Sequence, residues 1–199
     1  MRWDRFFDDL EDQLASEWEA ERAALDTEAE RLRLSRVGLR VRLRSLAVQD
    51  ARIALELADG IRLRATLGGV GADWVSAVPV DGVGAALIPI EAIVEVAAPQ
   101  ADLLRSAQPA EAESPLAARR TFGFAVRDLV RRRVRVAVHL VSGRMLHGTI
   151  DRAGADHLDL ALHDVGAARR NREVSGYRLV PYRSIVRVQV DAAGELRGP

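Results

Sequence analysis

The sequence predicts a mainly β protein with helices (α+β), in which two tandem, helix-capped, five-stranded barrels follow a long amphipathic N-terminal helix. Three observations lead to this fold class: an internal repeat, a period-two alternation of apolar residues in each copy, and a helical apolar pattern near the N-terminus. The expected parts are a helix (1–36), a first barrel (37–98), a linker (99–115), a second barrel (116–190) and a flexible tail (191–199).

The first segment has apolar residues spaced three, four and seven apart, with acids between them. They are Trp3, Phe7, Leu10, Leu14, Trp18, Leu25 and Leu32. This spacing predicts one amphipathic helix of roughly thirty residues. Six arginines against eleven acids through Arg36 argue against an anionic membrane surface. The apolar seam is expected to form a coiled coil, to cover a barrel of its own chain, or to bind a protein partner through Trp3, Phe6, Phe7, Leu10, Leu14 and Trp18.

An internal repeat governs the rest of the chain. At a shift of 83 positions, ten residues of the first copy align with chemically similar residues of the second. In the first copy these residues are Ile53, Leu55, Leu57, Gly60, Leu63, Thr66, Gly71, Ala72, Asp73 and Val75. Their counterparts in the second copy are, in the same order, Val136, Val138, Leu140, Gly143, Leu146, Thr149, Gly154, Ala155, Asp156 and Leu158. Further on, LIPIEAIVEV (87–96) matches LVPYRSIVRV (179–188) at a shift of 92, so the second copy has nine extra residues near 166–176.

Each copy shows the pattern of a short helix followed by five strands. Leu39, Leu43 and Leu46 match Phe122, Val126 and Leu129 as one helix face, and alternating apolar residues such as Leu158, Leu160 and Leu162 indicate strands. Asp59-Gly60 and Ser142-Gly143 predict hairpin turns. Ala97 to Pro115, rich in Ala and Pro, is typical of a linker. Five bent strands are expected to close into a barrel, which removes exposed sheet edges.

The second copy resembles the first signature of the Sm and Sm-like family, which includes the bacterial Hfq proteins. The residues that carry the resemblance are Val138, Leu140, Gly143, Leu146, Gly148, Ile150, Leu158, Asp159, Leu160 and Leu162. The resemblance implies helix-capped barrels that form rings and bind single-stranded RNA. The chain departs from the family at Asp159 and Ser76, where many members place a base-contacting asparagine, and the stretch LVPYRSIV carries Arg183 without the usual following glycine. Other SH3-like barrels, including PRC-type barrels, share the strand-proline-strand ending.

The net charge differs between the two halves of the chain. Residues 1–115 contain 13 Arg and 21 acids, a net charge of −8, whereas residues 116–190 contain 15 Arg and 6 acids, a net charge of +9. This asymmetry indicates either an anionic partner for the basic half or attraction between the halves. The absence of cysteine excludes disulfides, thiolate zinc sites and cysteine nucleophiles. No long apolar window predicts a membrane span and the acidic N-terminus does not fit a signal peptide, so we expect a cytoplasmic protein.

The candidate nucleic-acid site consists of basic and aromatic side chains of the second copy. Its residues are Arg119, Arg120, Arg127, Arg131, Arg132, Arg133, Arg169, Arg170, Arg172 and Arg183, with Tyr177 and Tyr182 to stack on bases. The alternative is that these arginines form a solvated face or pair with the acidic N-terminal helix.

No pattern of a catalytic or cofactor site is present: the chain lacks a nucleophile elbow, a phosphate-binding glycine loop and a metalloprotease helix. The four histidines, His139, His147, His157 and His163, are predicted to point away from the barrel core, without the spacing of a metal site. Asp73 and Asp156 recur in both copies, which indicates a role in turns. We therefore expect a non-enzymatic protein without a metal or cofactor that binds single-stranded RNA or another nucleic-acid backbone through its second copy. The alternative is a protein adaptor or self-assembling scaffold that uses the N-terminal helix and barrel edges.

Overall fold

The computed structural model describes residues 2–82, 84–108, 119–163 and 174–190 and divides into two units, Met1–Gly38 and Leu39–Pro199. The first unit holds a single helix, α1 (Arg2–Ser35), at the place where the apolar spacing predicted one. The second unit contains both copies of the repeat, called here the first repeat (39–98) and the second repeat (119–190). No helix in the described residues is both long and apolar enough to cross a membrane.

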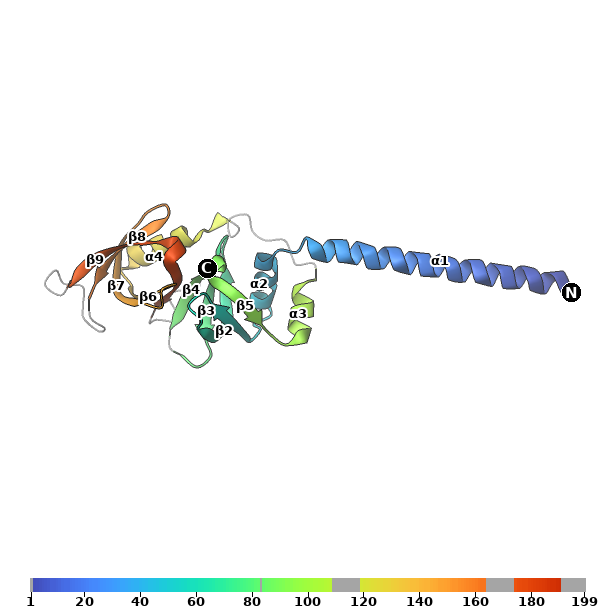
Figure 1. The fold of residues 1–199 in the computed structure, drawn as a ribbon, viewed down its shortest axis with the longest axis horizontal. Helices are drawn as coiled ribbons and strands as arrows, with labels where there is room; N and C mark the ends of the chain where they lie inside the picture. The colour runs from blue at the N-terminus through green and yellow to red at the C-terminus, as the bar shows by residue number, and fades with distance from the viewer. Residues whose placement is uncertain (1, 83, 109–118, 164–173, 191–199) are drawn as a thin grey trace. The chain divides into compact units, whose positions relative to one another are not determined.

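The second unit is built on one antiparallel sheet of ten strands (Figure 1). The first repeat supplies β1 (Ile53–Leu57), β2 (Arg62–Val70), β3 (Trp74–Pro79), β4 (Ala85–Pro89) and β5 (Ile93–Ala97). The second repeat supplies β6 (Arg135–Leu140), β7 (Met145–Ala153), β8 (His157–Leu162), β9 (Gly176–Pro181) and β10 (Ile185–Val190). The strand order is β5-β1-β2-β3-β4-β10-β6-β7-β8-β9, so each repeat places its own strands in the same order, fifth, first, second, third and fourth.

The prediction of two closed five-stranded barrels is wrong. Closure would require the fourth and fifth strands of one repeat to pair with each other, and in the structure they do not. Instead β4 of the first repeat pairs with β10 of the second, in the register Leu87 to Val188, Ala86 to Gln189 and Ala85 to Val190. The backbone groups of β4 that a barrel would satisfy within one repeat are satisfied by the other repeat, which joins the two into one continuous sheet.

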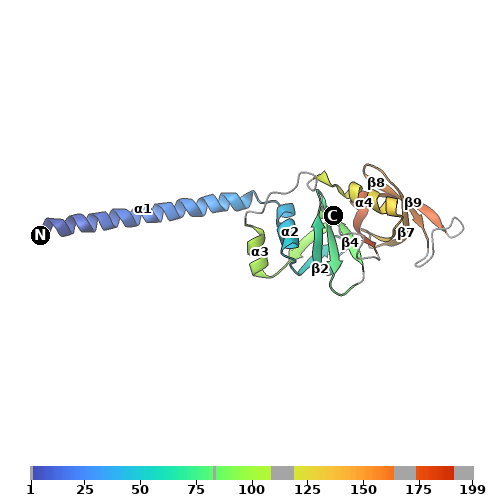
Figure 2. The same ribbon diagram turned by 180° about the vertical axis from the view of Figure 1, so that it is seen from behind.

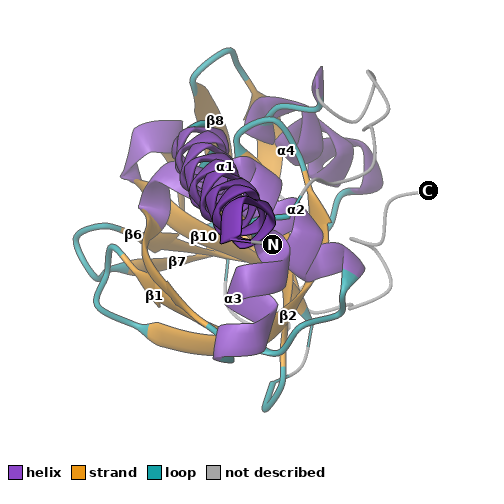
Figure 3. Cartoon of the chain, turned by 90° about the vertical axis from the view of Figure 1, so that its right-hand side faces the viewer, coloured by secondary structure: helices purple, strands orange, loops and turns teal. Residues whose placement is uncertain are grey.

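Two helices of the second unit lie beside the second strand of their own repeat: α2 (Leu39–Val48) beside β2 and α4 (Phe122–Arg132) beside β7 (Figures 2 and 3). The helix α3 (Gln100–Ser106) packs against α2. Short 3-10 turns, η1 (Ile90–Ala92) and η3 (Tyr182–Ser184), precede the last strand of each repeat. The helix α3 occupies part of the predicted linker. It is held by Arg42 of α2, which donates to the Leu103 carbonyl at 2.8 Å and to the Ser106 hydroxyl at 3.0 Å. This explains why that stretch is ordered.

The two hairpin turns have the geometry that their sequences predicted. Gly60 and Gly143 both have φ of 78°, the left-handed region that glycine enters at low cost. In the first turn the Asp59 carboxylate also accepts a hydrogen bond from the Ile61 amide at 3.1 Å. Both turns therefore fix the register of the first two strands of their repeat.

Each repeat has its own apolar core, and the two cores share strands at the junction. The predicted helix faces are buried: Leu43 and Leu46 of α2 lie in the first core, and Phe122, Val126 and Leu129 of α4 lie in the second. Leu87 of β4 packs into the core of the second repeat, while Val186 of β10 packs into the core of the first. Each repeat thus contributes one apolar side chain to the core of the other, so the junction between the repeats is part of the core of the second unit.

Candidate functional site

The second repeat presents four exposed arginines on one helix and its end, called here the α4 arginine face: Arg127, Arg131, Arg132 and Arg133. The helix α4 is capped at its N-terminus by Thr121, whose side chain accepts from the Phe124 amide at 3.3 Å, and is followed by Arg133 in a left-handed conformation. Its apolar side is fixed in the core, so the arginines are held on the opposite side. Cations in the last turn also complement the helix dipole.

The charge of the α4 arginine face is only partly compensated. The Asp128 carboxylate forms ion pairs with the guanidinium of Arg131 at 2.7 Å and with that of Arg132 at 2.8 Å, so one negative charge is shared by two positive charges. The side chains of Arg131 and Arg132 remain 72% and 50% exposed. The described part of the second repeat contains 12 arginines and 4 acids, a net charge of +8. A surface of this kind can bind phosphates, because guanidinium groups form bidentate hydrogen bonds with them.

The structure distributes the other predicted basic residues differently. Arg119 and Arg183 are exposed, and Arg120 is partly buried. The backbone carbonyl of Arg120 accepts from the Ala72 amide at 2.8 Å and from the Trp74 indole at 2.9 Å, so this segment joins the two repeats. Arg169, Arg170 and Arg172 lie outside the described residues.

The two tyrosines have different surroundings. Tyr177 is 61% exposed on β9. Tyr182 packs edge-on against Phe122, with ring centroids 5.3 Å apart, and donates to the Gly154 carbonyl at 3.1 Å. Burial raises the pKa of Tyr182 above its usual value. The ring of Tyr182 is therefore engaged in packing at the start of α4.

The predicted partner-binding residues all belong to α1. Trp18 is 74% exposed. For the others the structure describes the helical backbone but not the side chains: Trp3, Phe6, Phe7, Leu10 and Leu14. Within the described side chains of α1, Leu25 and Leu32 are also exposed, at 65% and 52%.

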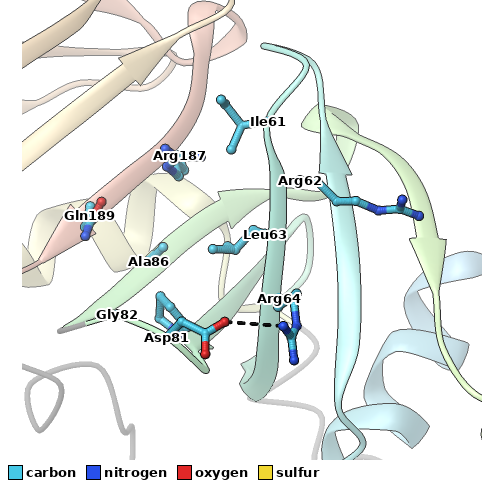
Figure 4. Close-up of a pocket in the computed structure, with 10 residues that line it drawn as sticks. Ile61, Arg62, Leu63, Arg64, Asp81, Gly82, Ala86, Arg187 and Gln189 are labelled. Atoms are coloured by element: carbon cyan, nitrogen blue, oxygen red, sulfur yellow. Dashed lines mark ion pairs between the residues drawn. The ribbon is translucent and has the colours of Figure 1, made fainter.

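A charged cluster at the junction of the repeats was not predicted from the sequence. Arg187 of β10 lies with its guanidinium 3.9 Å from the Asp59 carboxylate, and the two side chains are only 12% and 5% exposed. Arg187 also approaches Nδ1 of His139 at 3.2 Å. It borders a pocket of about 310 Å³ whose lining also includes Ile61, the first residues of β2 and Ala86 of β4 (Figure 4). The cluster ties the first hairpin turn of one repeat to the last strand of the other.

A second unpredicted contact joins the β2–β3 turn to the start of α4. The Asp73 carboxylate accepts from the Phe122 amide at 2.6 Å, and the Trp74 indole donates to the Arg120 carbonyl just before this helix. Asp73 thus caps a helix of the other repeat, where a free helix end has unsatisfied amides. Its recurrence as Asp156 was the available sequence signal, but the sequence interpretation placed the role of this side chain in its own turn and not at a helix of the other repeat.

Replacing Asp73 with alanine should lower the free energy of unfolding by about 1–2 kcal/mol, because the cap of α4 is lost. The matched control is Asp156→Ala at the same turn of the second repeat. The Asp156 side chain is 89% exposed and pairs only with His157 at 2.8 Å among the described contacts. Urea unfolding at low protein concentration should show a much smaller loss for the control. Equal losses would contradict the capping role of Asp73.

His139 predicts a pH dependence of stability. Its pKa is lowered below 6.5 by burial and by the positive charge of Arg187. The unfolded chain therefore binds a proton at this site at a pH where the folded chain does not, so stability is full above about pH 6.5 and falls as the pH drops below it. Urea unfolding between about pH 7.5 and 5.5 should show this decline, and His139→Gln should reduce it. An unchanged slope in the variant would rule out His139 as the cause.

The histidines do not all point outward as predicted. His163 is 5% exposed, and its Nε2 lies 2.9 Å from the Thr149 hydroxyl, so a buried polar pair replaces the expected surface position. Its place near the end of β8, beside the inserted loop, takes it out of the alternation that the prediction used. In the described part of the chain no three His, Cys, Asp or Glu side chains are grouped as a metal site would require.

Comparisons with known proteins do not assign the chain to a group. No family model matches it, and neither a curated protein nor a solved structure does.

Proposed function

We propose that the chain is a non-enzymatic, cytoplasmic protein that binds the backbone of single-stranded RNA on the α4 arginine face. The observation that carries the proposal is the set of four exposed arginines at Arg127, Arg131, Arg132 and Arg133, with Asp128 as the one acid among them. The resemblance of the second repeat to the Sm-like motif supports RNA as the polyanion.

The expected contacts are mainly electrostatic. Each guanidinium that meets a phosphate releases condensed counterions, so binding weakens steeply as salt rises. Stacking on Tyr182 is not part of the proposal, since its ring packs on Phe122. The chemistry is thus that of a positively charged track with little sequence preference.

The test is fluorescence anisotropy of labelled single-stranded RNA across a salt series, with the intact protein and a variant carrying Arg127→Gln, Arg131→Gln and Arg132→Gln. Glutamine keeps the helix propensity and removes the charge. Losing three phosphate contacts should lower the slope of log affinity against log salt by about 2, at about 0.7 per contact on a single strand. Arg133 is left in place so that all three substitutions lie within the helix itself, before its left-handed end.

The matched control removes three arginines from the first repeat, Arg52, Arg62 and Arg64, again by glutamine. Arg62 and Arg64 form exposed pairs with Glu95 at 3.4 Å and Asp81 at 3.6 Å, which contribute little to stability. This control should bind RNA with the affinity and salt slope of the wild type. Absence of binding at low salt, or equal losses in both triple variants, would refute the proposed site.

A second candidate function, a protein adaptor, is favoured by the exposure of Trp18 at 74% on α1. A partner that buries this indole would bind mainly through apolar contact and would be far less sensitive to salt than RNA. Quantitative pull-down with the wild type and Trp18→Glu should then reveal a protein retained in high salt by the former only. Identical profiles from the two baits would count against this function.

A further inference from the structure

The face of β5, β1 and β2 that points away from the core holds a pocket of about 500 Å³. Its floor is formed by small residues, because Ala54 of β1 lies opposite Ala97 of β5 on one side and Arg64 of β2 on the other. Arg52 precedes Ala54 by two positions, and Arg62 precedes Arg64 by two, so these side chains share the same face. The rest of the lining is apolar: Ile53, Val80, Ala98 and Pro99. Small-molecule sites have volumes of about 300–1,000 Å³, so the pocket is large enough for a small ligand.

The charges of two lining arginines are compensated from outside the pocket. The described residues that line it include three arginines and no acid. Arg62 and Arg64 form exposed ion pairs with Glu95 at 3.4 Å and with Asp81 at 3.6 Å. A third acid, Glu56, lies opposite Arg62 in the register of β1 and β2. These acids keep the two guanidinium groups at the rim and leave the floor of the pocket apolar.

Arg52 differs from the other two lining arginines. It is exposed and forms no ion pair with a described residue. Glu56, on the same face of β1, lies four positions along the strand, a distance of about 13 Å. The pocket therefore carries a positive charge at its Arg52 end, directly beside the apolar floor at Ala54.

The second repeat shows that the fold does not require this lining. At the shift of 83, the positions of Arg62 and Arg64 are occupied by Met145 and His147. The counterpart of β5 is β10, which is covered by β4 at the junction of the repeats. The arginines of the pocket are thus a property of the first repeat, beyond what the shared architecture needs.

We propose that this pocket binds an amphipathic monoanion, a carboxylate on a short apolar chain. Arg52 would hold the carboxylate through two parallel hydrogen bonds, and the chain would lie over Ala54 and Ala97. The methylene stems of Arg62 and Arg64 would cover the chain while their charged ends stay in water. A phosphate ester carries about −1.5 to −2 charge near neutral pH, more than one free guanidinium matches, so the site favours a carboxylate. This site is separate from the α4 arginine face and does not rest on RNA binding.

Isothermal titration calorimetry of the full-length, RNA-free protein with octanoate tests the site, at concentrations below those at which micelles form. Octanoate should bind at a single site. Acetate, which has the carboxylate without the chain, should not bind measurably. Octyltrimethylammonium, which has the chain with a positive charge, should not bind either. Absence of octanoate binding would overturn the proposal, and so would equal binding of octyltrimethylammonium.

Two single variants test the two parts of the pocket. Arg52→Gln should weaken octanoate binding about ten-fold or more, because a charge-assisted contact is lost. Ala54→Ile should abolish binding, because the larger side chain fills the floor, and a β-branched residue suits a strand. Urea unfolding checks that Ala54→Ile is folded, while Arg52→Gln alters only an exposed side chain and tests the site independently. An unchanged affinity in Arg52→Gln would rule out the proposed site.

Two triple variants separate this pocket from the α4 arginine face. The first carries Arg127→Gln, Arg131→Gln and Arg132→Gln, and it should bind octanoate as the wild type does. The second carries Arg52→Gln, Arg62→Gln and Arg64→Gln, and it should lose octanoate binding. Equal losses in both would show that net charge alone attracts the ligand, and would overturn the pocket. Because octanoate binding is measured without RNA, the failure of either proposal leaves the other standing.

Discussion

Replacing Asp59 with asparagine should lower the free energy of unfolding by about 3 kcal/mol, at the low end of the range for breaking a buried ion pair. The asparagine side chain keeps an oxygen that accepts from the Ile61 amide, so the turn itself is preserved. The charge is lost, and Arg187, 12% exposed, keeps a guanidinium whose burial already lowers its pKa. Urea unfolding near neutral pH, monitored by tryptophan fluorescence, measures the change.

Two further variants separate the charge from other effects. Ser142 holds the corresponding turn position in the second repeat and is exposed, so Ser142→Ala should leave stability within about 0.5 kcal/mol of the wild type. Combining Asp59→Asn with Arg187→Met removes both charges and should recover most of the loss. If the double variant is as unstable as the single one, the unpaired arginine is not the cause.

The local elements were predictable because their signals are local. The three- and four-residue spacing of apolar side chains locates α1, α2 and α4, and the glycines at 60 and 143 locate the hairpin turns. Both kinds of signal depend on backbone preferences and on which face of an element is apolar. Neither one depends on what lies beyond the next strand.

The barrels were predicted wrongly because alternation shows which face of a strand is buried, not which strand pairs with its edge. The sequence does contain a signal at this point. Ala85–Pro89 reads AALIP, an unbroken apolar run, whereas the corresponding YRLVP of 177–181 mixes polar and apolar residues. A continuous apolar run is typical of a strand buried on both faces. The difference between the two copies therefore indicates that β4 lies inside a larger sheet and β9 at its edge.

The candidate site shows the same division between local and long-range information. The arginines of α4 could be placed on an exposed helix face because Phe122, Val126 and Leu129 define the buried one. The pair formed by Asp59 and Arg187 joins residues 128 positions apart across the junction, and Asp73 caps a helix of the other repeat. Such contacts depend on how the repeats meet, which periodicity does not reveal.

Replacing Gly148 is the second substitution that we expect to change stability strongly. The equivalent residue of the first repeat provides a comparison. A Cβ atom at Gly148 would clash with the Ala161 carbonyl oxygen and would lie 3.0 Å from the carbonyl carbon of the same residue. This obstacle is backbone of the neighbouring strand β8, which cannot move aside as a flexible side chain can. Gly148→Ala should therefore cost about 3 kcal/mol, at the upper end for overpacking a core. Thermal and urea unfolding measure the loss.

The first repeat has alanine at the corresponding position, Ala65, fully buried between β1 and β3. The sheet has room for a methyl group at Ala65 but not at Gly148, so the two equivalent positions differ in how closely the neighbouring strand packs against them. The reciprocal change Ala65→Gly should cost about 1–2 kcal/mol, from one lost buried methyl and a more flexible strand. Surface substitutions usually change stability by no more than about 0.5 kcal/mol. A change of that size for Gly148→Ala would refute the close approach of β7 and β8 at this point.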